Sequence, residues 1–161
     1  MGIGWHPYFV LPSGNRRQAK LAIPAKERAL VDNYDNVFPT GKLVPLTGTP
    51  YDFSVPGGAP LGELFLDDCF VNLQKNAQGQ STAEIIDPAA KYGIRIRSLS
   101  PEISAVQVYA PIDKSFVALE PQFNWADPFS PVWGAKANTG MVTLQPGQTV
   151  TYSVQLELFV P

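Results

Sequence analysis

Proline and glycine set the strongest limit on what this chain can fold into, because sixteen prolines and thirteen glycines are spread along its 161 residues. Proline lacks a backbone N–H and glycine is a weak helix former. Together they interrupt nearly every window that could hold a 3.6-residue hydrophobic period. Only residues 25–31 have helical propensity, and that segment is short and directly follows Pro24. We therefore expect little α-helix.

Strand patterns are much clearer than helix patterns. Residues 92–97 alternate, with Ile94 and Ile96 expected to point inward. Residues 149–158 also alternate polar and apolar side chains over ten positions. A period of two places the apolar members of this second segment on one buried face of a strand: Val150, Tyr152, Val154, Leu156 and Leu158.

Shorter segments with similar character predict further strands at residues 83–86, 102–109, 115–120 and 141–144. Strands that follow one another through short turns, without intervening helices, predict an all-β fold, specifically an antiparallel β-sandwich. We expect residues 1–161 to form a single domain of this kind. Two longer stretches, 41–60 and 123–134, are predicted to be loops that shape a site or wrap a surface.

Composition excludes several classes of function. A formal net charge of -2 gives no basic excess, so we expect no nucleic-acid partner. No apolar run is long enough for a membrane span, and the start of the chain lacks the pattern of a signal peptide, so the expected location is the cytoplasm. Cys69 is the single cysteine, and no Cys/His spacing is typical of a metal site. We expect neither a metal nor an organic cofactor.

Three polar sites stand in bulky apolar surroundings. His6 is the only histidine and lies in Gly-Trp-His-Pro-Tyr-Phe, Glu120 lies in Leu-Glu-Pro-Gln, and Asp67 and Asp68 lie in Leu-Asp-Asp-Cys-Phe. One imidazole and two acidic sites are the groups that an acid–base enzyme needs. A purely structural interpretation is also open for each: a packed histidine, an exposed strand end and a solvated turn. In that interpretation the aromatic neighbours form the core: Trp5, Phe9 and Phe70.

Opening and reclosing a sugar hemiacetal is one reaction that such groups can perform. It requires a base at the anomeric hydroxyl and an acid at the ring oxygen, and no metal or nucleotide. Aromatic side chains near the polar motifs could stack on a pyranose: Trp5, Phe123, Trp125, Phe129 and Trp133. A glycosidase would instead use a carboxylate pair such as Asp67 and Glu120, which leaves His6 without a role.

Five short motifs, in order along nearly the whole chain, resemble the aldose 1-epimerase (galactose mutarotase) family. They are His-Pro-Tyr-Phe, Thr-Pro-Tyr-Asp-Phe, Leu-Asp-Asp-Cys-Phe, Val-Gln-Val-Tyr and Leu-Glu-Pro-Gln. The resemblance implies a β-supersandwich fold with His6 as general acid and Glu120 as general base. It also implies substrate contacts from Asp67, with Asp68 as second choice, and from Gln107. Trp125 is the aromatic residue that we add to the substrate-binding set.

The resemblance covers only the C-terminal half of such enzymes, whose full members are roughly twice as long. The family's substrate-binding arginine and second active-site histidine belong to the half that has no counterpart here. The chain is therefore expected to be a truncated supersandwich, as a fragment, half of a split enzyme or a stand-alone remnant. A sandwich cut in this way exposes sheet edges, so we expect a homo-oligomer or a partner that covers them.

Three functions remain open on the sequence. The first is an aldose 1-epimerase-like protein that interconverts the α and β anomers of a hexose. The second is a non-catalytic carbohydrate-binding remnant or one half of a split enzyme. The third is a hexose-6-phosphate 1-epimerase, for which the candidate phosphate ligands are Arg16, Arg17, Arg95 and Arg97.

Overall fold

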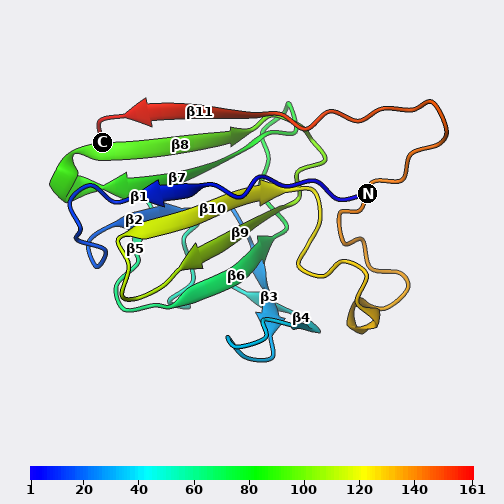
Figure 1. Ribbon diagram of the computed structural model, residues 1–161, viewed down its shortest axis with the longest axis horizontal. Coiled ribbons are helices and arrows are strands. Elements are labelled where there is room, and N and C mark those ends of the chain that lie inside the picture. Colours follow the sequence, from blue (N-terminus) through cyan, green and yellow to red (C-terminus); the bar gives the residue numbers. More distant parts are fainter.

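The computed structural model describes all residues from 1 to 161, and they form eleven strands in two antiparallel sheets (Figure 1). Sheet A has the order β1-β10-β9-β6-β3-β4 and sheet B the order β11-β8-β7-β2-β5. The strands of sheet A are β1 (Tyr8–Val10), β3 (Glu27–Val31), β4 (Pro39–Pro45), β6 (Leu66–Val71), β9 (Ala105–Ala110) and β10 (Phe116–Gln122). Those of sheet B are β2 (Lys20–Ala22), β5 (Ala59–Pro60), β7 (Ser81–Asp87), β8 (Tyr92–Ser98) and β11 (Val154–Phe159).

The prediction of an all-β antiparallel fold is confirmed, and helix is limited to two three-residue 3₁₀ turns, η1 (Pro88–Ala90) and η2 (Pro131–Trp133). Neither of them has the length or apolar character of a membrane-spanning helix. Residues 25–31 do not form a helix, because the pairing of β3 with β4 on one side and β6 on the other outweighs the local propensity. Residues 141–144 do not form a strand. The Val142 N–H instead donates to the carbonyl of Met1, outside both sheets.

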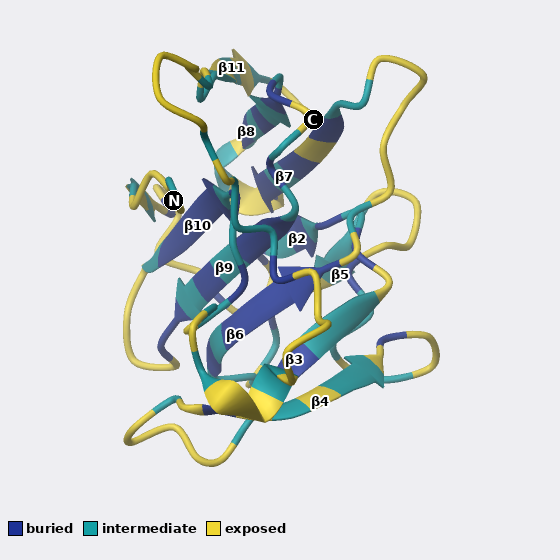
Figure 2. Ribbon diagram, turned by 90° about the vertical axis from the view of Figure 1, so that its right-hand side faces the viewer, coloured by how far each residue is buried: buried dark blue, intermediate teal, exposed yellow.

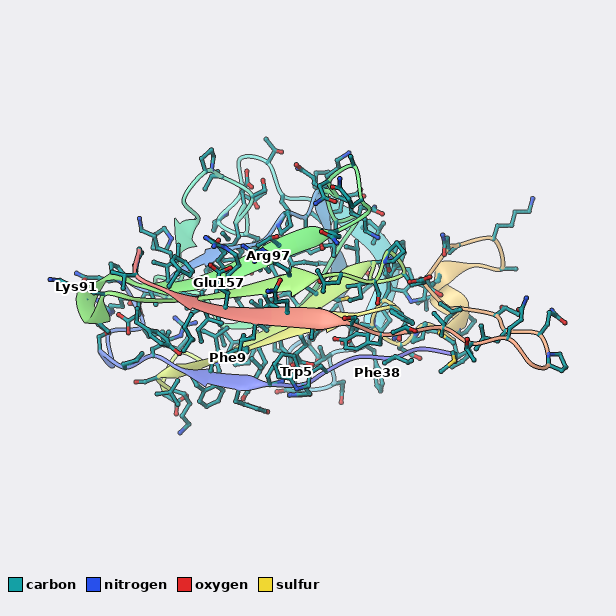
Figure 3. All side chains as sticks on the ribbon, turned by 90° about the horizontal axis from the view of Figure 1, so that it is seen from above. Trp5, Phe9, Phe38, Lys91, Arg97 and Glu157 are labelled. Carbon is teal, nitrogen blue, oxygen red and sulfur yellow. The ribbon has the colours of Figure 1, made fainter.

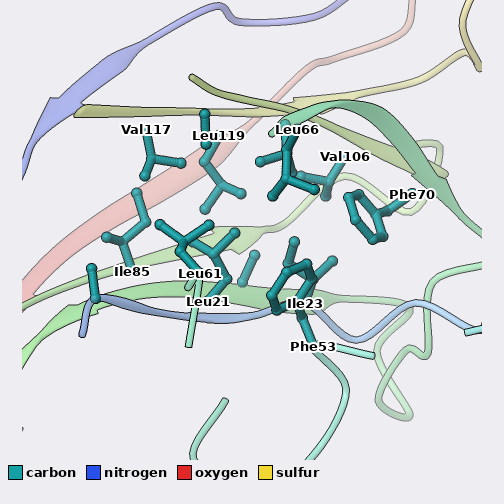
Figure 4. Close-up of a cluster of buried hydrophobic side chains, with 14 of the residues drawn as sticks. Leu21, Ile23, Phe53, Leu61, Leu66, Phe70, Ile85, Val106, Val117 and Leu119 are labelled. Carbon is teal, nitrogen blue, oxygen red and sulfur yellow. The ribbon is translucent and has the colours of Figure 1, made fainter. Parts of the chain in front are cut away.

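The hydrophobic core fills the space between the two sheets. Alternate residues of each central strand point into it, as Val106 and Val108 do from β9 and Ile94 and Ile96 do from β8. Figure 4 shows this layer: Leu66, Phe70, Val106, Val117 and Leu119 from sheet A meet Leu21 and Ile85 from sheet B. The intervening residues of the same strands therefore point away from the core, and in sheet A they form an outer face.

Part of that outer face is covered by the long connection after β10. Trp125 packs there with Ala29, Cys69, Val71 and Ala105 in a second, smaller apolar cluster. The prediction that residues 123–134 wrap a surface is thus confirmed. In the stretch 41–60, the first residues extend β4, and the loop that follows it delivers Phe53 into the main core.

β11 forms the edge of sheet B and stands beyond the strands of sheet A (Figure 2). The prediction of a strand over residues 149–158 is correct for its second half only. The expected burial of its apolar face is wrong at Leu156 and Leu158, which are 48% and 65% exposed. Their side of β11 extends past sheet A and has no layer opposite it.

The opposite face of β11 makes polar contacts with β8. Arg95 pairs with Glu84 and Glu157, and Arg97 pairs with Glu157 at 2.7 Å. Figure 3 shows Arg97 and Glu157 side by side on this face. Phe159 places its ring over Gly93 and against the Arg95 guanidinium, 4.5 Å from the ring centroid. These contacts attach β11 to the sheet from its solvent side.

Candidate active site

The outer face of sheet A carries a compact group of polar side chains, because strand register brings alternate residues of neighbouring strands into line. Glu120 in β10 is opposite Gln107 in β9, and Gln107 is opposite Cys69 in β6. One row along, Asp67 is opposite Tyr109. All five alternate with residues of the main core and so face away from it.

Four of these side chains, all except Cys69, line a cavity of about 410 Å³. Its walls are His6, Tyr8, Asp67, Gln107, Tyr109 and Glu120. The volume lies within the range of roughly 300–1,000 Å³ that is typical of small-molecule sites. Four residues singled out in the sequence are therefore brought together, namely His6, Asp67, Gln107 and Glu120.

His6 reaches the cavity from a segment that leaves the sheet. β1 pairs with β10 from Tyr8 onward, and pairing resumes only as an isolated bridge between Gly4 and Gln122. Pro7 and Pro121 occupy this gap, and neither has an N–H to donate to a ladder. The segment around His6 is thus held at both ends but free of strand pairing in between.

His6 and Glu120 form a direct pair, with 3.3 Å between Nε2 and Oε1. The His6 side chain is 59% exposed and that of Glu120 only 9%, so one partner is open to solvent and the other is rooted in the sheet. The His6 ring also stacks on Tyr8, with 5.1 Å between ring centroids and 21° between planes. The imidazole is therefore oriented from two sides.

The electrostatics of the cavity favour a protonated carboxyl group. Burial raises the pKa of Glu120 to about 7, with a smaller upward contribution from Asp67, while the proximity of His6 acts in the opposite direction. Burial also raises the pKa of Asp67, against the effect of a hydrogen bond from Gln107. A carboxyl group that titrates near neutrality is suited to proton transfer.

Gln107 orients Asp67 by donating from Nε2 to its Oδ1 at 2.7 Å. This contact fixes the Gln107 amide so that its oxygen remains available as an acceptor. The second carboxylate oxygen of Asp67 likewise remains available. Two acceptors in fixed positions beside a proton-transfer pair can bind the hydroxyl groups of a small polar ligand.

Asp68 lies on the other side of the sheet. It is fully buried, forms an ion pair with Arg28, and accepts a hydrogen bond from the Tyr34 hydroxyl at 3.0 Å. Arg28 in turn lies over the ring of Tyr51. Because neighbouring strand residues point to opposite faces, Asp67 and Asp68 cannot both reach the cavity. Asp68 therefore belongs to a structural network beneath the site.

None of the aromatic side chains proposed for sugar stacking lines this cavity. Trp125 packs against Trp133, 5.2 Å between centroids, and borders a separate cavity of about 190 Å³. Phe123 is fully buried, and Phe129 is exposed in the first part of the connection between β10 and β11. Of the residues expected in the core, Phe70 is buried, Phe9 is partly buried and packs against the main core, and Trp5 is 38% exposed.

The four arginines considered as phosphate ligands also lie elsewhere. Arg16 is buried and donates to the carbonyls of Gly62 and Ala110, both at 2.8 Å. Arg17 pairs with Glu63 near the surface. Arg95 and Arg97 lie on the outer face of sheet B, opposite to the cavity.

Tyr8 and Tyr109 are the two cavity residues that the sequence reasoning did not assign to the site. Each is two positions after a predicted site residue in a strand or its approach, Tyr8 after His6 and Tyr109 after Gln107. The period of two, applied to the predicted site residues themselves, was the signal that could have identified both.

A family model described as aldose 1-epimerase matches residues 1–157. A search of curated proteins finds no significant match.

Among solved structures, a galactose mutarotase-like protein from Clostridium acetobutylicum matches with a TM-score of 0.71 at 18% identity, covering 98% of this chain and 46% of that chain. One from Lactobacillus casei matches with a TM-score of 0.69 at 20% identity, covering 98% and 53%. An aldose epimerase homologue from C. elegans matches with a TM-score of 0.62 at 21% identity, covering 80% and 43%. The chain thus spans about half the length of these structures, and at such identities the likeness shows the fold.

Proposed function

The chain belongs to the aldose 1-epimerase family, and on this basis we propose that it interconverts the α and β anomers of a hexose, with His6 as the acid and Glu120 as the base. The observation that carries the proposal is the His6–Glu120 pair in a cavity that also presents Asp67 and Gln107. No other cavity in the molecule combines an imidazole with a carboxyl group.

In the proposed reaction, the Glu120 carboxylate takes the proton of the anomeric hydroxyl while the C1–O5 bond breaks and protonated His6 gives a proton to O5. The product is the open-chain aldehyde. Rotation about the C1–C2 bond presents the other face of the carbonyl. As the ring closes, His6 takes back the proton from the O5 hydroxyl and Glu120 returns its proton to the carbonyl oxygen. The anomeric oxygen and O5 are bonded to the same carbon, so an acid and a base only a few ångströms apart can each reach one of them.

The different exposure of the two groups supports this division of roles. Glu120 is fixed in β10, and its raised pKa of about 7 makes it a base matched to neutral conditions. His6 lies on an unpaired segment and is largely exposed, so its ring can rotate away from Glu120 and admit the sugar between them. The free carboxylate oxygen of Asp67 and the amide oxygen of Gln107 would accept hydrogen bonds from ring hydroxyls at the far side of the cavity.

A non-catalytic carbohydrate-binding role, or that of one half of a split enzyme, is the second candidate. The half-length match to the solved structures and the uncovered apolar side of β11 favour it. In either case we propose that a second copy or a partner chain covers Leu156 and Leu158 and the free edges of β1 and β11. A hexose-6-phosphate substrate has less support, because Arg16, Arg17, Arg95 and Arg97 all lie away from the cavity.

Polarimetry of freshly dissolved α-glucose and α-galactose tests the proposal directly. The parent protein should accelerate mutarotation above the buffer rate, and His6→Asn and Glu120→Gln should each lower kcat by about 10²–10⁴-fold. Glu63→Gln, which changes an exposed carboxylate that does not line the cavity, serves as a matched control and should retain the parent rate.

A parent protein that is folded by circular dichroism, binds sugar and leaves the rate at the buffer value would select the binding role. If the His6→Asn and Glu120→Gln variants both accelerate mutarotation as well as the parent protein does, His6 and Glu120 are not the acid and base.

A further inference from the structure

Five aromatic rings form a continuous row that begins in the cavity and leaves it. The centroid separations are 5.1 Å from Tyr8 to Phe116, 6.0 Å from Phe116 to Tyr109, 6.1 Å from Tyr109 to Phe65 and 5.0 Å from Phe65 to Tyr34. Only the two rings of Tyr8 and Tyr109 line the cavity. The other end of the row lies outside it.

Strand register explains why the row exists. Tyr8 and Tyr109 both pair with Ala118, whose small side chain leaves space between them, and Phe116 lies one row further along the same face. Phe65 immediately precedes β6 and alternates with core residue Leu66, so it shares the outer face with Asp67. The row therefore crosses β1, β10, β9 and the start of β6.

Tyr34 completes the row from the loop between β3 and β4. Its hydroxyl donates to Asp68, so the buried Arg28–Asp68 pair anchors this ring from beneath the sheet. Tyr34 is 38% exposed, Tyr8 is 56% exposed, and the three rings between them are partly exposed. Aromatic rings fixed in place and open to water form a surface suited to the apolar faces of sugar rings.

The position of the row relative to the polar groups indicates how a bound sugar would be oriented. His6 and Glu120 mark the end of the cavity at β1 and β10, where the anomeric carbon would lie. Asp67 marks the β6 end, two residues after Phe65 on the same face. A hexose with its anomeric carbon at the first end would place its opposite hydroxyl groups near Asp67, facing Phe65 and Tyr34.

We propose that Phe65 and Tyr34 form a second sugar subsite, which takes the non-reducing ring of a disaccharide whose reducing ring occupies the cavity. The linkage would run through a hydroxyl remote from the anomeric carbon, such as that on C4, because the anomeric hydroxyl must stay free. The subsite takes a neutral sugar, since Arg28, the cation beneath Tyr34, is already paired with Asp68, and Asp32 and Asp35 lie close to Tyr34 in the sequence. This inference rests on the proposed function and specifies its substrate class.

Calorimetric titration of glucose, maltose and cellobiose tests the subsite, because the two disaccharides present a second glucose ring through α and β linkages at C4. At least one of them should bind roughly three- to ten-fold more tightly than glucose. Phe65→Ala should reduce this preference to none and leave the affinity for glucose unchanged. Phe129→Ala removes an exposed ring that lies outside the row and should leave both affinities unchanged.

Phe65→Leu, which keeps apolar packing and removes the aromatic face, should give the same result as Phe65→Ala and protects the test against a folding defect. Equal affinity for glucose and both disaccharides in the parent protein would reject the subsite while the proposed function stands. An equal loss of glucose and disaccharide affinity in Phe65→Leu would reject it as well. Failure of all three sugars to bind would reject the subsite, while the polarimetry of glucose and galactose decides separately whether the proposed function stands.

Discussion

At Glu120 the proposed function and the stability of the folded protein make opposite demands. It is buried on the outer face of sheet A beside a second carboxyl group, Asp67, and its pKa is raised to about 7. A carboxyl group with a raised pKa prefers to be protonated in the folded state, so ionising it costs folding free energy. The same property makes it an effective base near neutral pH.

The free energy of unfolding should therefore decrease as pH rises from about 4.5 to 7, because the folded protein retains the Glu120 proton over this range while the unfolded chain releases it. Glu120→Gln removes this contribution and should become more stable than the parent by about 2–4 kcal/mol above pH 7, with little difference below pH 4.5. Urea unfolding at several pH values measures both curves.

Asp67, whose raised pKa acts in the same direction, is present in both proteins, so the difference between the two curves reports Glu120 together with its interaction with Asp67. Glu63→Gln is the control at an exposed carboxylate and should follow the parent curve. Identical pH dependence in the parent and Glu120→Gln would contradict the raised pKa.

At the same scale, Asp67 and Asp68 show how far the sequence could predict the cavity. Two adjacent aspartates in a strand must point to opposite faces, and the sequence analysis chose Asp67 over Asp68 as the substrate contact. What it could not show is that Arg28, forty positions earlier, would bring a cation under the sheet to pair with Asp68. The packing of Trp125 away from the cavity could not be predicted for a related reason. Its neighbours Cys69, Val71 and Ala105 come from distant segments of the chain.

At the scale of elements, strands with neighbours on both sides were predicted best. The prediction of β8 and of its inward-pointing residues is confirmed, because Ile94 and Ile96 are buried by sheet A as the alternation requires. β3 was interpreted as helix-prone because its pairing with β4 and β6 depends on residues far along the chain. β11 alternates in the same way as β8 but is an edge strand, and alternation alone does not reveal whether a second layer exists.

The attachment of β11 depends on a glycine in β8. A Cβ at position 93 would lie 2.5–2.8 Å from ring atoms of Phe159, so Gly93→Ala should displace the ring and destabilise the protein by about 1–3 kcal/mol. In a Phe159→Ala background the same substitution should cost nothing or stabilise slightly, because alanine is less costly than glycine in a strand. Thermal unfolding of the four proteins in this double-mutant cycle gives the coupling. Additive effects of the two substitutions would show that the ring does not cover Gly93.

At the scale of the whole molecule, the prediction that a half-length supersandwich leaves surface uncovered agrees with the exposure of Leu156 and Leu158. Both side chains lie on the side of β11 that continues the core-facing layer of sheet B beyond sheet A. The edges β1 and β11 also leave backbone hydrogen-bonding groups unpaired. Apolar side chains and free strand edges together are features of an interaction surface.

Self-association should therefore depend on the apolar side of β11. Light scattering after size-exclusion chromatography should show oligomers of the parent protein at high concentration. Leu158→Thr should shift them toward the monomer, because it removes an apolar contact and replaces leucine by a β-branched residue that is well suited to a strand. Gln155→Thr changes an exposed position on the other face of the same strand and is the matched control. A parent protein that stays monomeric at every concentration would favour a partner chain over a second copy.

The arrangement of β6, β9 and β10 also limits how the cavity can diversify. Each strand supplies the core with one set of alternate residues and the cavity with the other, as Val106 and Val108 alternate with Gln107 and Tyr109. Deleting one residue from β9 would turn glutamine and tyrosine into the core and expose valines in their place. Variation in ligand preference can therefore arise here through exchange of side chains but not through gain or loss of a residue. Changes in length are confined to the connections between strands, above all the long segment from β10 to β11.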